Sequence, residues 1–543
     1  MNIIPGAISF LIGFAVFLHT STGAFFPDDT PWTMVAVFDL EHQHPPGYPL
    51  YTLISRLWAV LPLGGPSFRL NLMSATLMSL TGVLVGCLSS PIIRTKSGNP
   101  RTQAVFLISC ALIFDLSWTT WEQALSFKGG VYALNVLITL GIIALSSGLL
   151  ASNIKPARLI ACLSFLIGLG LAHHWMTILV NIPIAILPII WWRRNFFPHP
   201  FRFLYGAVII LLAISLYIFL PIRSGKAHVN WGVPSDLKGF ISVVSRAQYR
   251  SEERTTPAKG YWSQKTRYVA GFFRREWTTP GLIIGIVGLI ASLSILPRET
   301  MMLFLSAFFT GISVFWYDLK PPNCFFSRAH FYLPCIAIGS VFIGLSIFPF
   351  WQKSSKYVKI ILASVLFSAI ILSAFTRVES HNLSHAYVPY DYSKNILDCS
   401  PANAFLLCEG ESDWFPCLFQ VRVERYRTDI EPLNYYLMRI GYRPFLKAYS
   451  LKYPQLVSRE GTGYVMNPRT YRPIAATIEM DDPSFPGLSS LTGFVRYAHG
   501  FSPARAKQVL SRLRSRGIYG ERKLTEMYST YTQTTVESWN KSP

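Results

Sequence analysis

Charged residues are scarce in this sequence of 543 residues. Asp, Glu, Lys and Arg make up 14% of it, whereas soluble proteins usually carry about 25%. Hydrophobic residues account for 51%. The shortage of charge excludes an ordinary soluble globular protein and predicts a protein embedded in a membrane.

Signals for nucleic-acid binding are also missing, although the formal net charge is +21. The sequence contains neither a C2H2 zinc-finger spacing nor an RNP signature. We therefore exclude a nucleic-acid partner. The positive charge is better explained by membrane topology, anionic lipid headgroups or a phosphate-bearing substrate.

Long apolar runs are abundant and predict about 11 transmembrane helices. Several runs approach the roughly 20 residues that cross a bilayer, and the shorter ones can tilt or end part-way. The first run resembles a signal peptide, but it lacks a preceding basic residue, which favours a span. We interpret the fifth and sixth runs as two spans, with one bent span as the alternative. The runs are Ile3–His19, Leu70–Ile93, Ala104–Thr119, Val131–Ala151, Leu159–His173, Trp175–Trp192, Phe203–Pro221, Gly281–Leu296, Met301–Tyr317, Phe331–Phe350 and Val358–Phe375.

Lys and Arg are concentrated in alternate short loops, which the positive-inside rule assigns to the cytoplasm. We expect a membrane unit at residues 1–376 with outer loops 20–68 and 223–279, followed by an outer domain at 377–543. The cytoplasmic markers are Arg94, Lys96, Arg101, Lys155, Arg158, Arg193, Arg194, Arg202, Arg298, Lys353, Lys356 and Lys359.

The eight cysteines lack metal-binding spacing. Cys399, Cys408 and Cys417 fall in the outer tail, where either a disulfide or unpaired thiols would fit. The tail is polar and rich in Tyr. Its segment NAFLLCEGESDWFP predicts a buried strand followed by an acidic turn, and residues 502–517 predict an amphipathic helix. We expect a small soluble α/β or helical domain.

Carboxylates are few, so their positions are informative. Asp28 and Asp29 lie in the first outer loop, where a carboxylate can take a proton from an acceptor hydroxyl. A turn in which the aspartates cap the backbone or face solvent is the alternative.

The stretch EHQHPPGYPLY, shortly after the two aspartates, cannot continue a helix because of its prolines. It presents His44 as a phosphate or hydrogen-bond partner and Tyr48 as a flat surface. An interfacial turn with aromatic anchors would also fit.

Basic residues recur at three predicted outer boundaries. Arg223 ends a span, Arg246 follows in the outer loop, and Arg328 precedes the tenth run. Arginine forks bind phosphate oxygens bidentately, although lipid-headgroup anchoring is equally compatible.

Ionisable residues bordering the spans are further candidates, because such groups are costly in a membrane. His173 and His174 end the fifth run. Asp115 and Glu122 flank the end of the third. Capping by a neighbouring group is the structural alternative for each.

Five motifs occur in order along most of the chain: HPPGYPLY, GLGLAHH, LPIRSGKAHVNWGVPS, RAQY and GESDWFP. Together they resemble polytopic GT-C-type glycosyltransferases, the bacterial relatives of the plexin-domain protein O-mannosyltransferases of the eukaryotic secretory pathway. The resemblance implies a GT-C-like fold and transfer of a sugar from a polyprenyl-phosphate donor on the outer face. It extends the predicted substrate-binding set to Asn230, Gln248, Tyr249 and Tyr332.

The resemblance also identifies Asp29, which lies 15 residues before His44, as the family aspartate. It implies an inverting transfer in which Asp29 is the base. Two family glutamates are absent, because Trp32 and Gly130 stand at their positions. Asp28 or Glu122 are the candidate replacements, and metal use stays open.

The expected partners are membrane lipid, a polyprenyl-phosphate sugar and a protein or glycan acceptor. The expected location is the cell inner membrane, or the endoplasmic reticulum membrane in a eukaryote. A transporter or flippase for a lipid-linked glycan, or a non-catalytic envelope scaffold, is the alternative function. The apolar inner halves of the spans count against transport.

Overall fold

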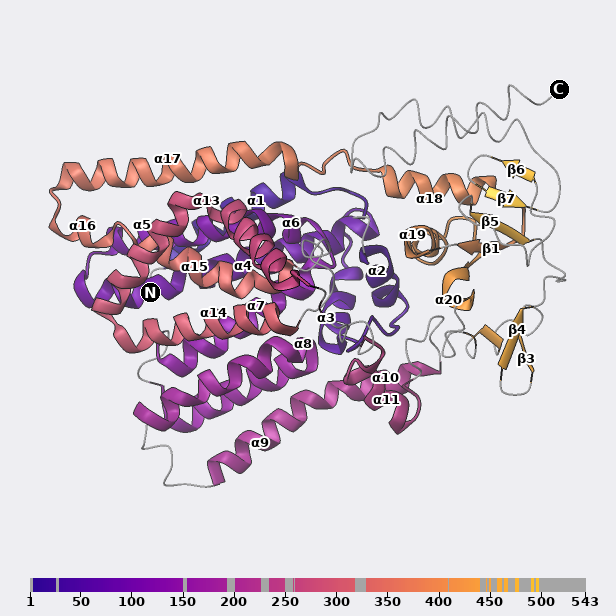
Figure 1. Ribbon diagram of the computed structural model, residues 1–543, viewed down its shortest axis with the longest axis horizontal. Coiled ribbons are helices and arrows are strands. Elements are labelled where there is room, and N and C mark those ends of the chain that lie inside the picture. Colours follow the sequence, from indigo (N-terminus) through magenta and orange to yellow (C-terminus); the bar gives the residue numbers. More distant parts are fainter. Residues whose placement is uncertain are drawn as a thin grey trace.

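The fold is described from a computed structural model. It describes residues 3–25, 29–149, 154–192, 201–225, 234–249, 257, 259–317, 329–408, 410–439, 446, 449–450 and the strands at 457–460, 463–466, 474–477, 490–492 and 495–497. Long helices form a bundle that fills most of the molecule, and a smaller domain with strands lies beside one end of it (Figure 1).

Within the described residues, nine helices are long and apolar enough to cross a membrane, or ten if the pair α5–α6, bent by 69°, counts as one span. The long helices are α1 (Ile3–Thr20), α4 (Pro66–Lys96), α5 (Pro100–Asp115), α7 (Gly129–Ser147), α8 (Pro156–Trp192), α9 (Phe201–Ile214), α13 (Tyr261–Ile295), α14 (Pro297–Tyr317), α15 (Leu333–Leu345) and α17 (Lys356–His381). This confirms a polytopic helical membrane protein.

The predicted spans Leu159–His173 and Trp175–Trp192 correspond to the two helical arms of α8, which meet at a break. Its backbone leaves helical geometry at His174, where φ is −133° and ψ is 78°. A Cβ on Gly170 would lie only 2.7 Å from the side chain of Ile178, eight residues later, so the two arms approach each other closely across the break. The count of nine or ten candidate spans includes α8 once.

The bundle has a protein core and a lipid-facing periphery. Of the most apolar windows, 83% of α7 and 78% of the helical segment at Ala329–Lys353 are buried, but only 6% of α17. Large apolar residues such as Leu372 and Phe375 of α17 are therefore exposed in the isolated chain. In a bilayer such side chains meet lipid, and helices satisfy their own backbone polar groups.

Short elements gather at the end of the bundle that faces the smaller domain (Figure 1). They are α2 (Thr30–Phe38), α3 (Pro49–Ala59), α6 (Trp118–Leu125), η2 (Ser215–Ile218), α10 (Phe219–Ser224), α11 (Leu237–Val244) and η3 (Ala247–Tyr249); α16 (Phe348–Lys353) precedes α17. The proline-rich elbow between α2 and α3 turns at Gly47, whose φ of +97° disfavours other residues. His42 fixes the elbow to α10 through a 2.6 Å contact between Nε2 and the Leu220 carbonyl.

The C-terminal domain is an α/β unit. Of the two alternatives predicted from the sequence, α/β or helical, the structure has the first. Its five-stranded sheet has the order β2-β1-β5-β7-β6, in which β1 runs parallel to β2 and β5, and β7 runs antiparallel to β5 and β6. The elements are α18 (Val388–Cys399), β1 (Phe405–Cys408), α19 (Glu411–Arg422), β2 (Glu431–Asn434), α20 (Tyr435–Arg439), the hairpin β3 (Val457–Glu460) and β4 (Gly463–Met466), β5 (Ile474–Thr477), β6 (Ser490–Thr492) and β7 (Val495–Tyr497).

The predicted buried strand is confirmed as β1. The predicted acidic turn is wrong, because Glu411 and Asp413 form the first turn of α19. Acidic side chains there are favourable for the helix dipole. Cys399, Cys408 and Cys417 are buried free thiols. The helix expected at 502–517 and Cys324 lie outside the described residues.

Candidate active site

A cavity of about 460 Å³ lies at the end of the bundle that carries the short elements. Residues from seven separate parts of the chain meet there, from the start of α2 to the segment before α15. The polar and charged lining residues are Asp29, His44, Tyr48, Lys128, Tyr132, His174, Thr177, Arg246, Tyr249, Ser313 and His330. The structure thus brings together six predicted site residues: Asp29, His44, Tyr48, His174, Arg246 and Tyr249.

Asp29 stands at the N-cap of α2, but its side chain does not cap the helix. Its backbone carbonyl instead accepts hydrogen bonds from the backbone amide and hydroxyl of Thr33. The carboxylate faces Lys128 Nζ at 3.7 Å and His44 Nε2 at 3.8 Å. Burial by itself raises the pKa of Asp29, but the fields of His44, Lys128 and His330 outweigh it and leave that pKa below its usual value of 3.8. Asp29 is therefore ionised at neutral pH.

His44 is the buried imidazole of the elbow. Burial, with Lys128 and Arg246, lowers its pKa to about 4 against the opposing effect of Asp29. The ring is therefore neutral at pH 7. Of the two roles predicted for it, hydrogen bonding is favoured over binding phosphate as a cation. Its Nδ1 lies 3.4 Å from the Tyr249 hydroxyl.

Lys128 is the most important residue that the sequence interpretation missed. It immediately precedes α7, is 5% exposed, and places Nζ 5.1 Å from the centre of the Tyr48 ring. A buried lysine needs a negative partner, and Asp29 supplies it. The signal was present in the stretch SFKGGVY, where a lysine directly precedes the start of an apolar run.

Arg246 brings a second cation to the cavity from the connection between α11 and η3. Its guanidinium lies 4.9 Å from the centre of the Tyr249 ring, and Nη1 lies 2.9 Å from Met176 Sδ. Gln248 belongs to η3, and the position of its side chain is outside the described part of the chain.

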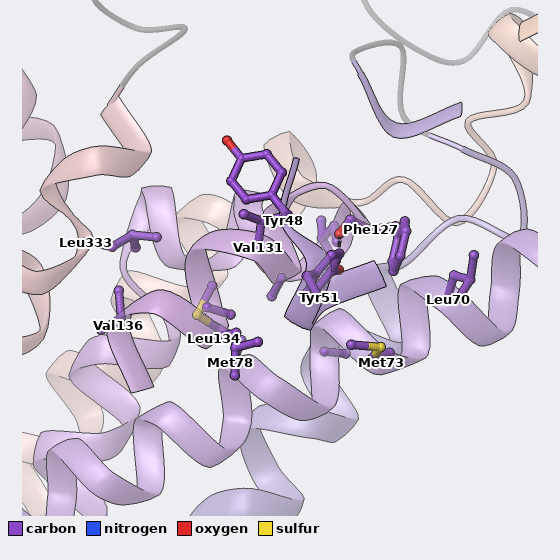
Figure 2. Close-up of a cluster of buried hydrophobic side chains, with 14 of the residues drawn as sticks. Tyr48, Tyr51, Leu70, Met73, Met78, Phe127, Val131, Leu134, Val136 and Leu333 are labelled. Carbon is purple, nitrogen blue, oxygen red and sulfur yellow. Dashed lines mark hydrogen bonds between the residues drawn. The ribbon is translucent and has the colours of Figure 1, made fainter. Parts of the chain in front are cut away.

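Tyr48 and Tyr51 of the elbow motif have different surroundings (Figure 2). Tyr51 points into the packed cluster and donates to the Phe127 carbonyl at 2.6 Å. The Tyr48 phenol points away from that cluster, and its ring stacks on His174 at 6.0 Å with planes 12° apart. Tyr132 and His330, both missed from sequence, complete an aromatic wall by stacking at 3.7 Å.

Four predicted site residues have other surroundings. The Arg223 guanidinium donates to the Asp39 and Leu40 carbonyls at 2.7 and 2.8 Å and so holds the elbow. Buried His173 contacts the Val131 carbonyl through Nε2 at 2.7 Å. Glu122 of α6 and buried Tyr332 do not line the cavity. Asp28, Asn230 and Arg328 lie outside the described residues.

The two positions at which the resemblance predicts glutamates, Trp32 and Gly130, are used for packing. A side chain at Gly130 would collide with the Tyr51 hydroxyl and the Ser74 hydroxyl. Trp32 stacks on Trp414 and Phe415 of α19 at 5.7 and 5.8 Å and joins the C-terminal domain to the bundle. Gly130 therefore has no room for a carboxylate, and the indole of Trp32 is used for packing. Within the described part of the chain, no three His, Cys, Asp or Glu residues are grouped closely enough to hold a metal ion.

Comparisons with known proteins agree with this architecture. Residues 29–196 match the family model described as "Protein O-mannosyl-transferase TMEM260 N-terminal domain". Protein O-mannosyl-transferase TMEM260 of Mus musculus is 24% identical over 447 residues, which cover 78% of this chain and 61% of the mouse protein. The chain resembles the O-mannosyltransferases in sequence.

Two crystal structures of ArnT from Cupriavidus metallidurans have a similar fold. The structure with undecaprenyl phosphate aligns with a TM-score of 0.53 at 10% identity, covering 88% of this chain and 93% of ArnT. The apo structure gives 0.51 at 11% identity, covering 88% and 92%. The fold is GT-C-like.

Proposed function

We propose that this chain is a membrane glycosyltransferase that moves a sugar, mannose by its resemblance, from a polyprenyl-phosphate donor to a hydroxyl of a protein or glycan. The observation that carries the proposal is the ionised Asp29 carboxylate, held beside Lys128 and close to neutral His44 in one cavity. A carboxylate that is not used to cap its own helix is suited to accept a proton during transfer.

The proposed reaction is a single inverting displacement. The acceptor oxygen attacks the anomeric carbon opposite the phosphate, while Asp29 takes the hydroxyl proton. The bond between the anomeric carbon and the phosphate oxygen breaks, and the polyprenyl phosphate leaves with the electron pair. Asp29 then returns its proton to water or to the departing phosphate, so charge and atoms balance.

Lys128 and Arg246 are the proposed phosphate ligands. Both line the cavity, and preorganised cations stabilise the charge that develops on a leaving group. Arg223 is assigned a positioning role instead, because its guanidinium holds the backbone at Asp39 and Leu40. The proposed phosphate ligands therefore include Arg246, which was predicted from the sequence, and Lys128, which was not.

The comparisons support this proposal at the level of fold and donor class. The matched family segment, 29–196, contains Asp29, His44, Lys128 and His174. A protein of the same fold binds undecaprenyl phosphate. We place the cavity and the C-terminal domain on the outer face of the inner membrane, or in the endoplasmic reticulum lumen of a eukaryote, from the distribution of Lys and Arg.

A transfer assay tests the function directly. The purified full chain in liposomes is incubated with polyprenyl-phosphate mannose and with Ser- and Thr-containing acceptors, and the products are analysed by mass spectrometry and NMR. We expect a glycosylated acceptor with the anomeric configuration opposite to that of the donor. Retained configuration would overturn the displacement. Absence of transfer by folded protein from every polyprenyl-phosphate hexose would overturn the function.

A further inference from the structure

The bend in α8 places His174 at the cavity. This residue alone carries the non-helical φ and ψ of the bend, and its side chain is 1% exposed. A break inside a helix sacrifices regular backbone hydrogen bonding, so it needs a compensating reason. Here the bend directs the chain from the arm that ends at His173 to the arm whose residues Trp175 and Met176 line the cavity.

The polar atoms of His174 are unsatisfied. Neither Nδ1 nor Nε2 has a hydrogen-bond partner among the residues that the structure describes. Buried polar side chains are nearly always hydrogen-bonded, and an unsatisfied one is costly. By contrast, both ring nitrogens of buried His381 contact backbone carbonyls, those of Arg377 and Trp118. The ring nitrogens of His174 are therefore available to form hydrogen bonds with a ligand.

The surroundings of His174 are aromatic. Its ring lies 6.0 Å from Tyr48, 5.6 Å from Phe331 and 6.3 Å from Tyr132. Flat apolar surfaces combined with one donor and one acceptor suit an uncharged polyhydroxyl ring better than a phosphate. Lys128 lies over the Tyr48 ring, so Tyr48 contacts both this charged group and His174.

We propose that His174 is a sugar-recognition residue, which hydrogen-bonds hydroxyls of the transferred sugar while Tyr48, Tyr132 and Phe331 pack around the ring. This inference rests on the proposed function. It divides the cavity into a cationic part for the phosphate and an aromatic part for the sugar. The lipid-phosphate affinity then depends on Lys128, and the additional affinity for the sugar depends on His174.

Paired binding measurements separate the two parts. The probes are polyprenyl phosphate without sugar and polyprenyl-phosphate mannose, each titrated against purified full chain. His174→Phe keeps an aromatic ring against Tyr48 but removes both nitrogens. It should bind bare polyprenyl phosphate within about twofold of wild type and lose about tenfold in affinity for the sugar-bearing donor, since each neutral hydrogen bond contributes only a few-fold. His174→Gln should recover part of the loss, because it restores a donor and an acceptor.

Two controls make the outcomes distinct. His381→Gln alters a buried histidine outside the cavity and should leave the ratio of the two affinities unchanged. Lys128→Met should weaken both probes together. If wild type binds neither probe, the proposed function itself is overturned. If wild type binds both, and folded His174→Phe and His174→Gln keep the wild-type ratio, sugar recognition by His174 is overturned while the function stands. Should the Phe variant not fold, His174→Leu, which also lacks both ring nitrogens, decides through the same ratio, and an unchanged ratio in folded protein would contradict the assignment.

Discussion

Two buried polar clusters use similar residue types in opposite ways. The cavity cluster consists of Asp29, His44, Lys128 and Arg246. A second, closed cluster consists of Thr119, Glu276, Arg377 and His381, where α6, α13 and α17 meet.

In the closed cluster, short hydrogen bonds join the groups. The Glu276 carboxylate accepts from the Thr119 hydroxyl at 2.6 Å and from its backbone amide at 3.1 Å. Arg377 donates to the Leu116 and Glu276 carbonyls, each at 2.6 Å. A network of this kind fixes helices relative to one another.

In the cavity cluster, the two contacts of Asp29 are 3.7 and 3.8 Å, longer than the roughly 2.7–3.2 Å of direct hydrogen bonds. The geometry leaves room for a substrate beside the Asp29 carboxylate. The comparison teaches that satisfaction of polar groups, rather than residue type, separates a structural cluster from a reactive one. Substitutions in the two clusters should therefore have opposite effects on activity and stability.

The largest effect is expected for Asp29→Asn. The amide keeps the shape of the side chain but cannot accept the acceptor proton, so turnover should fall by roughly 10²–10⁴-fold with donor affinity nearly unchanged. Steady-state transfer kinetics and a thermal-shift experiment measure both quantities. Asp236→Asn is the matched control, because that carboxylate does cap its helix, by accepting from the Gly239 amide at 2.7 Å. Wild-type turnover in Asp29→Asn would end the assignment of Asp29 as the base.

Arg377→Met should reduce the stability of the folded chain and leave turnover nearly unchanged. Removing the guanidinium leaves the backbone carbonyls of Leu116 and Glu276 without their buried donor, which should destabilise the folded chain by about 1–3 kcal/mol for each carbonyl. The protein that remains folded should keep turnover within a few-fold of wild type. Thermal unfolding in detergent, compared with Arg101→Met on the exposed start of α5, tests this. An unchanged melting temperature would show that the closed cluster does not hold α17.

Lys128→Met tests the cationic part of the cavity. Loss of one charge-assisted contact to phosphate should weaken donor binding by roughly 10–100-fold, because such hydrogen bonds contribute about 1.5–3 kcal/mol. Titration with polyprenyl phosphate measures the change. Arg223→Met is the informative comparison, since a residue that holds the elbow should reduce turnover more than affinity for the lipid phosphate. Equal donor affinity in wild type and Lys128→Met would show that residues other than Lys128 bind the phosphate.

The pH profile gives the smallest but most specific effect. The pKa of His44 is about 4 and that of Asp29 lies below 3.8, so the acidic limb of turnover should lie near pH 4 rather than near 6.5. Between pH 6.5 and 4 the unfolded chain binds a proton at His44 that the folded chain does not, so the His44 contribution makes stability fall as pH falls through this window. Lys128 lowers both pKa values, so Lys128→Met should move the acidic limb to higher pH. A limb near 6.5 in wild type would contradict a neutral His44.

Much of the fold follows from local sequence. Each predicted apolar run overlaps one or more helices of the bundle, and the buried strand at NAFLLC forms β1, because hydropathy and side-chain alternation act over neighbouring residues. The choice of Asp29, 15 residues before His44, follows from the family resemblance. These features depend on chemistry within about 20 residues of chain.

Tertiary structure alone decided which of the other polar residues meet. Lys128 and His330 enter the cavity and Arg223 does not, although the sequence marks all three as polar groups near a predicted boundary. The bend at His174 and the stacking of Trp32 on α19 likewise depend on contacts between distant segments. The physical reason is that a cavity assembled from residues 29, 128, 174, 246 and 330 exists only once the helices have packed, and packing geometry is not encoded in any one segment.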